Sequence, residues 1–241
     1  MQIAVSPERS TGPGWLGSLG AHSRRRRGDG VLVASSPAVS DSFSEAFLAE
    51  TAQIARDLDS AAVEAIAKGL ADRRDRGGRL FIVGVGGGAG HASHAVCDFR
   101  KLAGFEAYTP VDNVSELTAR SNDEGFETVF EAWLRTSRMS QLDALLVFSV
   151  GGGSREHGVS LNLVRAVEFA RDVGAGVYGV VGRPDGITAR LADACLVVPA
   201  PAERLTPHAE AWQAVIWHLL VSHPALESQS AKWESIDAGG P

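Results

Sequence analysis

The sequence predicts an α/β protein built on a mostly parallel sheet. The first observation is that short runs, such as RLFIVGV at 79–85 and LDALLVFSV at 142–150, are almost continuously apolar. Such runs are typical of strands that are buried on both faces. The second observation is that these runs alternate with longer segments in which apolar residues recur at helical spacing. Right-handed crossovers between such strands produce a parallel sheet.

The predicted elements follow one another from residue 42. Helical spacing holds over 42–75, but Asp57, Asp59 and Ser60 interrupt it, so we expect two helices or one kinked helix. Strands are expected at 79–85, 106–110, 142–150, 176–181 and 195–198. The later helices are expected at 89–102, 113–121, 126–136, 154–173, 187–191 and 206–220. Ser154 is the expected N-cap of the helix at 154–173.

Composition limits the function classes. The chain has 241 residues, of which 44% are hydrophobic, so it can bury one good-sized core. The formal net charge of -6 argues against nucleic acid as the main partner, because phosphate contacts need a basic face. The apolar runs are too short to span a membrane. Cys97 and Cys195 lie in apolar segments, which indicates free thiols in a reducing, cytoplasmic protein.

The two ends of the chain differ from the middle. Residues 1–41 are rich in Gly, Pro, Ser and Arg and show no periodicity, which predicts a disordered basic tail. The run Arg24–Arg27 could bind a polyanion, and a solvated tail without function is the simpler interpretation. Residues 229–241 are expected to fray. A single folded domain is therefore expected over residues 42–228.

Two glycine-rich turns each follow a predicted strand. Their glycines are Gly86, Gly87 and Gly88 in the first turn, and Gly151, Gly152 and Gly153 in the second. Ligands bind at the carboxyl ends of parallel strands, and glycine lets the backbone approach them closely. With Ser149 and Ser154 as hydroxyl donors, the second turn could hold a phosphate at a helix start; an ordinary tight turn is the alternative.

Neither glycine turn has the pattern of a nucleotide-binding loop. No lysine follows the second turn in the place that a Walker A motif requires. The first turn only approximates the Rossmann fingerprint, and Glu106 and Asp112 are poor candidates for the acidic residue that should end the next strand. The sequence therefore predicts no nucleotide cofactor.

Two predicted helices carry a possible set of metal ligands or acid–base groups. His94 and Asp98 are one helical turn apart and share a face, and His91 lies on nearly the same face. In the last helix, Glu210 and His218 stand among apolar residues, where polar side chains usually need partners. Together His94, Asp98, Glu210 and His218 form a reasonable zinc-type set. The alternative is that Glu210 faces solvent and His218 is an ordinary core histidine.

The remaining histidines and tryptophans receive weaker assignments. His208 could lie near the same site, whereas His157 and His223 have no evident partners and are expected at the surface. Three of the five tryptophans are expected in the core or at a subunit interface: Trp133, Trp212 and Trp217. None of these residues indicates a function by itself.

Four segments of residues 42–228 carry a family resemblance: GVGGGAGHASHAVCDF, SNDEGFETVF, FSVGGGS and the last helix. The first resembles G-N-G-G-S-A-x-D-A-x-H-x-x-x-E, with His94 and Asp98 at its histidine and glutamate. The second follows S-N-D-x-G-[FY]-E-x-V-F closely. On these motifs the chain is similar to the sugar isomerase (SIS) domain family, and most of all to its sedoheptulose-7-phosphate isomerases, also called phosphoheptose isomerases.

This resemblance implies a fold and an activity. The fold would be a three-layer α/β/α sandwich of the flavodoxin-like SIS type, usually assembled as a homotetramer. The activity would be interconversion of sedoheptulose 7-phosphate and D-glycero-D-manno-heptose 7-phosphate through an enediolate. Asp98 and His218 would be the base and the acid, and Zn²⁺ would bind to His94, Asp98, Glu210 and His218. The sugar phosphate would contact both glycine turns, Ser149, Ser154, Asn122 and Asp123.

The chain also departs from the family pattern. Val85, Gly88, His91, Val150, Gly151 and Glu210 replace Asn, Ser, Asp, Thr, Ser and Gln. Asp98 replaces a glutamate and is one methylene shorter, which would shift a catalytic base by ~1 Å. Two alternatives therefore stand beside the isomerase: a non-catalytic SIS module that binds a sugar phosphate or a protein, and an isomerase or epimerase of another phosphosugar.

Overall fold

The computed structural model describes residues 42–232, so the predicted tail at 1–41 and residues 233–241 lie outside the described part. Its five strands form one sheet in the order β2-β1-β3-β4-β5, and every neighbouring pair is parallel. The strands are β1 (Leu80–Gly84), β2 (Ala107–Tyr108), β3 (Ala144–Ser149), β4 (Gly176–Val181) and β5 (Ala194–Val197). The predicted parallel sheet and its strand positions are confirmed, and the order is that of flavodoxin-like folds.

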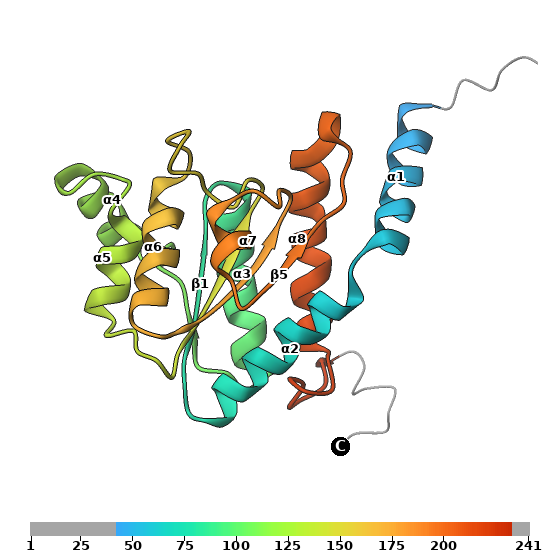
Figure 1. Cartoon of the computed structure of the whole chain (residues 1–241). Helices are drawn as coiled ribbons and strands as arrows, with labels where there is room; N and C mark the ends of the chain where they lie inside the picture. Colours follow the sequence, from blue (N-terminus) through green and yellow to red (C-terminus); the bar gives the residue numbers. More distant parts are fainter. Residues whose placement is uncertain (1–41, 233–241) are drawn as a thin grey trace, which may run out of the picture. The chain divides into compact units, whose positions relative to one another are not determined.

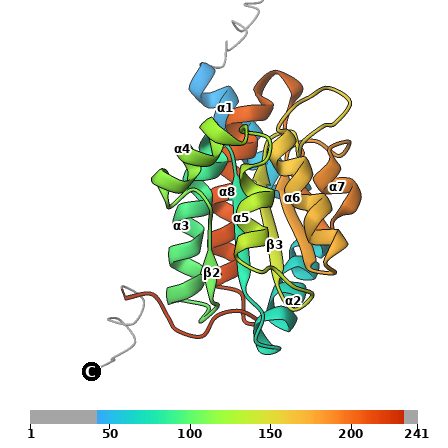
Figure 2. The same ribbon diagram turned by 90° about the vertical axis from the view of Figure 1, so that its left-hand side faces the viewer.

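Helices cover both faces of the sheet (Figures 1 and 2). They are α1 (Phe43–Asp57), α2 (Ser60–Asp75), α3 (Gly87–Lys101), α4 (Val114–Asp123), α5 (Val129–Thr136), α6 (Leu161–Asp172), α7 (Ile187–Leu191) and α8 (Leu205–Val221), with a 3₁₀ turn at Ala202–Arg204. Figure 2 shows α3 on one side of the sheet and α6 and α7 on the other. The three-layer α/β/α arrangement is therefore confirmed.

The core is divided by the sheet into two apolar clusters. Alternate residues of β1 point to opposite faces: Leu80 and Ile82 join the cluster under α2, α3 and α8, and Phe81 and Val83 join the cluster under α5 and α6. Burial of both faces explains why the strand sequences are continuously apolar. Trp212 and Trp217 belong to the first cluster, and Trp133 packs against the second.

The break predicted near residue 59 separates two helices. Ser42 and Glu45 form a capping box at the start of α1. Asp59 caps α2, because its carboxylate accepts hydrogen bonds from the N–H groups of Ala61 and Ala62. The polar residues that interrupt the apolar pattern thus end one helix and start the next.

The predicted helix start at Ser154 is wrong, because α6 begins at Leu161, after Ser160. Residues 150–160 form a loop, closed by a bridge between Ser154 and Val159. Gly152 and Gly153 have φ values of 71° and 80°, which a right-handed helix does not allow. The second glycine turn therefore does not lead directly into a helix. The first one does, since α3 begins at Gly87.

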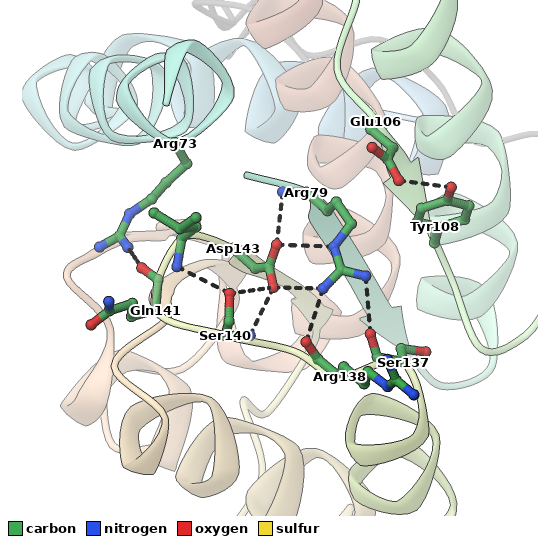
Figure 3. A network of polar contacts seen from close by, with 10 residues as sticks. Arg73, Arg79, Glu106, Tyr108, Ser137, Arg138, Ser140, Gln141 and Asp143 are labelled. Carbon is green, nitrogen blue, oxygen red and sulfur yellow. Dashed lines mark hydrogen bonds and ion pairs between the residues drawn. The ribbon is translucent and has the colours of Figure 1, made fainter. Parts of the chain in front are cut away.

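A polar network ties the starts of β1 and β3 together (Figure 3). The carboxylate of Asp143, only 2% exposed, accepts hydrogen bonds from the Arg79 N–H and guanidinium and from the N–H of Ser140. Arg79 also donates to the carbonyls of Ser137 and Arg138. Ligands of parallel sheets bind at the opposite, carboxyl ends of the strands, so this network stabilises the fold.

Candidate active site

Helices α3 and α8 pack side by side and run in the same direction. In order along both helices, Gly87 lies against Glu210, His91 against Gln213, and Asp98 against Trp217. We call this contact the α3–α8 seam. It begins at the first glycine turn, at the carboxyl end of β1, and it contains most of the polar residues that the sequence singled out. The fold thus brings together two segments more than 100 residues apart in the chain.

Three of the predicted metal ligands meet in the α3–α8 seam. The Nε2 atoms of His94 and His218 lie 3.4 and 3.6 Å from the same oxygen, Oδ2 of Asp98. One ligand atom from each of the three residues lies within 4.8 Å of the others. Asp98 is mostly buried, with 14% of its side chain exposed, whereas both imidazoles are more than half exposed. Solvent or a ligand can therefore reach the cluster from the imidazole side.

Hydrogen bonds set the chemical state of the cluster. Nδ1 of His218 lies 2.7 Å from the carbonyl oxygen of Ala214, which can only accept, so Nδ1 carries the hydrogen and Nε2 keeps a lone pair in the neutral ring. Trp217 donates from Nε1 to Oδ2 of Asp98 at 3.2 Å. The Nε2 lone pair and the carboxylate of Asp98 are both electron-rich and repel each other. A proton or a cation between them would remove this repulsion. Two imidazoles, one held by a backbone carbonyl, and one carboxylate fit a zinc-type ion.

Glu210 does not join the other three residues. Its carboxylate lies over Gly87, where a Cβ added to that glycine would meet it at 2.6 Å. Glu210 precedes His218 by eight residues, which is about 12 Å along a helix at 1.5 Å per residue. Because α3 and α8 run in the same direction, this displacement moves Glu210 towards the glycine turn and away from Asp98. The predicted four-residue set is therefore a three-residue set among residues 42–232.

His91 occupies the middle of the α3–α8 seam. Its Nδ1 lies 3.0 Å from Oε1 of Gln213, a fully buried side chain. Its ring lies beside that of Trp217, with centroids 5.1 Å apart. Gln213 was not singled out in the sequence, where an amide inside an apolar helix gives no specific signal.

The other histidines lie outside the cluster. His208, proposed from sequence as a possible neighbour, is buried under α1, where it stacks on Phe47 and pairs with Glu50. Hydrogen bonds from Arg204 and His208 lower the pKa of Glu50 to about 2. His157 is exposed, as expected, and bonds to the hydroxyl of Ser154. His223 is not simply a surface residue, since it pairs with Glu64 of α2.

The second glycine turn lines a cavity at the carboxyl ends of the strands. Within the turn, Ser149 accepts a hydrogen bond from the N–H of Gly152. The cavity, about 720 Å³, is also lined by the guanidinium-bearing residues Arg155, Arg183 and Arg190. Arg155 and Arg183 are paired with Glu168 and Asp185. Their charges are thus largely balanced by neighbouring carboxylates.

The smaller cavity, about 370 Å³, opens between the loops that follow β1 and β3. Its lining includes Val85, Phe126, Glu127, Ser160 and Asn162. The hydroxyl of Ser160 makes no capping hydrogen bond, and Nδ2 of the buried Asn162 has no partner within residues 42–232. Sequence reasoning missed these two donors, because it started α6 at Ser154.

Asn122 and Asp123, predicted to contact the sugar, do not line the smaller cavity. They lie at the end of α4, and Nδ2 of Asn122 donates to Oδ1 of Asp123 at 2.7 Å. The neighbouring residues Phe126 and Glu127, from the same SNDEGFETVF segment, reach the cavity instead. The segment thus reaches this cavity through Phe126 and Glu127, and the contact of Asn122 and Asp123 with the sugar stays a prediction.

Comparisons with known proteins agree with this architecture, although no protein-family model matches the chain. Over 188 residues it is 34% identical to the lincomycin biosynthesis protein LmbN of Streptomyces lincolnensis, a match that covers 73% of this chain and 66% of that protein. Over 176 residues it is 32% identical to the phosphoheptose isomerase of Solidesulfovibrio magneticus, covering 69% and 80%. The solved structure of phosphoheptose isomerase GmhA from Neisseria gonorrhoeae has a TM-score of 0.65 at 24% identity, covering 73% and 94%.

Proposed function

The chain belongs to the phosphoheptose isomerase family of SIS-domain proteins, and on that premise we propose that it is an aldose–ketose isomerase of sugar phosphates. The proposed substrate pair is sedoheptulose 7-phosphate and D-glycero-D-manno-heptose 7-phosphate. The observation that carries the proposal is the cluster of His94, Asp98 and His218 in the α3–α8 seam. It supplies a carboxylate and two imidazoles, two to three helical turns further along the helix that begins at the first glycine turn.

Asp98 and His218 carry the proton transfers in this proposal. Isomerisation of a ketose begins when a base removes a proton from C1, next to the carbonyl, and an acid protonates the carbonyl oxygen O2. Asp98 is the base, since its carboxylate is mostly buried and held by the N–H of Trp217. His218 is the acid in its protonated form, in which Nε2 carries the transferable proton and Nδ1 still donates to the carbonyl of Ala214. Asp98 then delivers a proton, which can exchange with solvent, to C2. His218, which has given its own proton to O2, takes the proton from O1, so that the aldose forms and both groups are restored. A general base or acid each contributes roughly 10²–10⁴-fold to the rate.

We propose that His94, Asp98 and His218 also form the site for a Zn²⁺ ion, which when bound would take the place of the proton on Nε2 of His218. The fit of two imidazoles and a carboxylate around one point supports it. When bound, the ion would supply a Lewis acid that polarises the substrate carbonyl. His94 has no other assigned role in the proposal, so the metal content of a His94→Gln variant tests this assignment: loss of bound zinc is expected, and full retention would contradict it.

The substrate phosphate is proposed to lie between the carboxyl ends of β1 and β3. Strand order reverses at this point of a flavodoxin-like sheet, and ligands bind there. Candidate donors are the backbone N–H groups of Gly86, Gly87, Gly151 and Gly153, with the hydroxyls of Ser149 and Ser160. The N–H groups of Gly88 and Gly152 shape the two turns instead, since they donate to Val85 and Ser149. Ser160 takes the place first given to Ser154, because it stands at the start of α6 and its hydroxyl is not used in capping.

A different phosphosugar is the second candidate substrate. It is favoured by the 34% identical relative, whose name refers to lincomycin biosynthesis and not to phosphoheptose isomerase. Replacement of the family asparagine by Val85 in the smaller cavity also changes the polarity around the sugar. Sedoheptulose 7-phosphate should therefore be assayed together with ketose phosphates of other chain lengths.

The test of the proposed function is proton NMR of the protein with sedoheptulose 7-phosphate in D₂O, with added zinc and after chelation. Aldose anomeric signals with deuterium at C2 are expected, and chelation should weaken them. Aldose signals from another ketose phosphate alone would reassign the substrate. Absence of any turnover or exchange across the panel would contradict the isomerase.

We further propose that the protein is a cytoplasmic homotetramer, as the family resemblance implies. Two apolar side chains of α8, Val215 and Leu219, are 48% and 42% exposed next to His218, which supports a contact between copies on this face. Light scattering should give four times the chain mass of 25.3 kDa; the mass of a single chain would contradict the tetramer. None of the helices within residues 42–232 has the length and apolar character to cross a bilayer.

A further inference from the structure

We propose that Glu210 determines where the substrate phosphate binds: its carboxylate keeps the phosphate off the first glycine turn and so confines it to the second. This inference rests on the proposed function, in which backbone N–H groups of both turns are candidate donors. Glu210 lies outside the cluster around Asp98, and this role in specificity accounts for a charged side chain at the first turn. The part of the substrate that reaches the first turn then carries no negative charge.

The carboxylate of Glu210 lies directly over the start of α3. All three of its atoms are within 2.7 Å of the position that a Cβ on Gly87 would take. Because Gly87 is the first residue of α3, an anion bound to the N–H groups of this helix start would lie against the carboxylate. Glu210 has no hydrogen-bond or ion-pair partner within residues 42–232, so none of the described cationic side chains is paired with its charge.

The first glycine turn has little with which to outweigh this charge. Val85 and Gly88 have no polar side chain, and the N–H of Gly88 already donates to the carbonyl of Val85. Only the N–H groups of Gly86 and Gly87 remain as donors in the turn. The positive end of the α3 dipole favours a negative charge, but Glu210 already supplies one there. At about 6 Å in partly exposed surroundings, repulsion between two unit charges weakens binding by roughly tenfold.

Packing of α8 holds the backbone of Glu210 next to the first turn. The preceding residue, Ala209, is fully buried, and its Cβ lies 3.1 Å from the position that a Cβ on Gly182 would take. One helical turn later, the fully buried Gln213 is hydrogen-bonded to His91 of α3 at 3.0 Å. Because buried residues flank Glu210 on both sides, its carboxylate stays within a side chain's reach of the turn.

The second glycine turn offers a phosphate different neighbours. Gly151 and Gly153 line the cavity of about 720 Å³, together with three guanidinium groups, those of Arg155, Arg183 and Arg190. Two of these groups are paired with carboxylates, whereas Arg190 forms no ion pair within residues 42–232. A phosphate therefore meets guanidinium groups at the second turn and an unpaired carboxylate at the first. This difference favours the second turn.

The test is a titration of the glycine-selectively ¹⁵N-labelled protein with inorganic phosphate, followed by the amide NMR signals of the two turns. In the wild type, we expect the signals of Gly151 and Gly153 to shift and those of Gly86 and Gly87 to stay in place. Glu210→Gln has the same shape without the charge, so the Gly86 and Gly87 signals should now shift as well, with an affinity higher by roughly tenfold or more.

Glu203→Gln is the matched control, because it removes the same charge from an exposed residue just before α8. It should behave like the wild type; a response like that of Glu210→Gln would assign the effect to net charge and overturn the proposal. Two further results would overturn it: Gly86 and Gly87 signals that shift in the wild type together with those of Gly151 and Gly153, or that stay in place in Glu210→Gln.

The titration needs no turnover, so failure of the proposed function is recognised separately. A wild-type protein in which neither turn responds to inorganic phosphate or to sedoheptulose 7-phosphate would contradict the phosphosugar function, and the role of Glu210 with it. A wild type in which both turns respond would contradict only the role of Glu210.

Discussion

Asp98 shows what single residues contribute to the site. One of its oxygens, Oδ2, lies within 3.2 to 3.6 Å of the indole nitrogen of Trp217 and of Nε2 of both His94 and His218. The spacing of His94 and Asp98 by one helical turn made their contact predictable from sequence. The Trp217 contact was not predictable, because a tryptophan in an apolar helix indicates only burial. The position of Glu210 outside the cluster could not be predicted, because it depends on the direction in which α8 packs on α3. The sequence of α8 does not show that direction.

Gly88 provides a prediction at the residue scale. The family pattern has serine here, with its hydroxyl in the phosphate loop, so the pattern alone predicts that Gly88→Ser improves phosphate binding. In this chain a Cβ on Gly88 would lie 2.5 Å from the carbonyl oxygen of Phe148 in β3. We therefore expect Gly88→Ser to lower the free energy of unfolding by roughly 1–3 kcal/mol, measured by thermal or urea denaturation.

Gly90 is the matched control for this substitution. It lies in the same helix, and a Cβ there would meet no atom within 4 Å. Gly90→Ala should leave stability unchanged or raise it by up to about 1 kcal/mol through helix propensity. Equal stability of Gly88→Ser and the wild type would contradict the close packing of α3 on β3.

Elements buried in the sheet were the most predictable, and loops were the least. The runs at β1 and β3 are apolar on both faces because helices cover both, and this pattern is visible in the sequence. The start of α6 was misplaced by seven residues, since Ser154 resembles an N-cap while the positive φ values of Gly152 and Gly153 are visible only in the structure. Because Ser160 and Asn162 follow this loop, the error also displaced part of the candidate site.

The ion pair between Arg79 and Asp143, at the starts of β1 and β3, should contribute measurably to the free energy of unfolding. Asp143→Asn removes the charge that the guanidinium of Arg79 faces, so we expect a loss of about 3 kcal/mol in the free energy of unfolding. At roughly 2–4 °C per kcal/mol for a domain of this size, the melting temperature should fall by roughly 6–12 °C. Asp72→Asn, which breaks an exposed pair with Arg76, should change it little.

The effect of Asp143 should depend on pH. Burial acts to raise the pKa of the carboxyl, but hydrogen bonds from Arg79 and Ser140 outweigh it, so the pKa lies below its ordinary value. A carboxyl with a lower pKa in the folded than in the unfolded state stabilises the fold fully above its unfolded value, about 3.9, and loses this contribution as the pH falls through the folded value. The stability difference between wild type and Asp143→Asn should therefore shrink below about pH 4. A constant difference down to pH 2 would contradict the ion pair.

At the scale of the whole molecule, the sheet order explains why the phosphate is proposed to lie between the ends of β1 and β3. Strands β1 and β3 are neighbours although β2 lies between them in sequence, so their carboxyl ends open a crevice between two loops. The alternation of strands and helices was enough to predict a parallel sheet. The three-layer arrangement and the isomerase activity were predicted from the family resemblance and not from the alternation. The seam between α3 and α8 required the tertiary structure, because it joins residues more than 100 positions apart.

In the proposed mechanism, Asp98 in the α3–α8 seam starts the isomerisation by removing a proton from C1. The most direct measurement is the entry of deuterium from D₂O into C1 of sedoheptulose 7-phosphate, compared between wild type and Asp98→Asn. We expect the variant to keep its melting temperature but to lose exchange at C1 and aldose formation together, each by roughly 10²-fold or more. Exchange at C1 that continues at the wild-type rate in Asp98→Asn would contradict the assignment of the base.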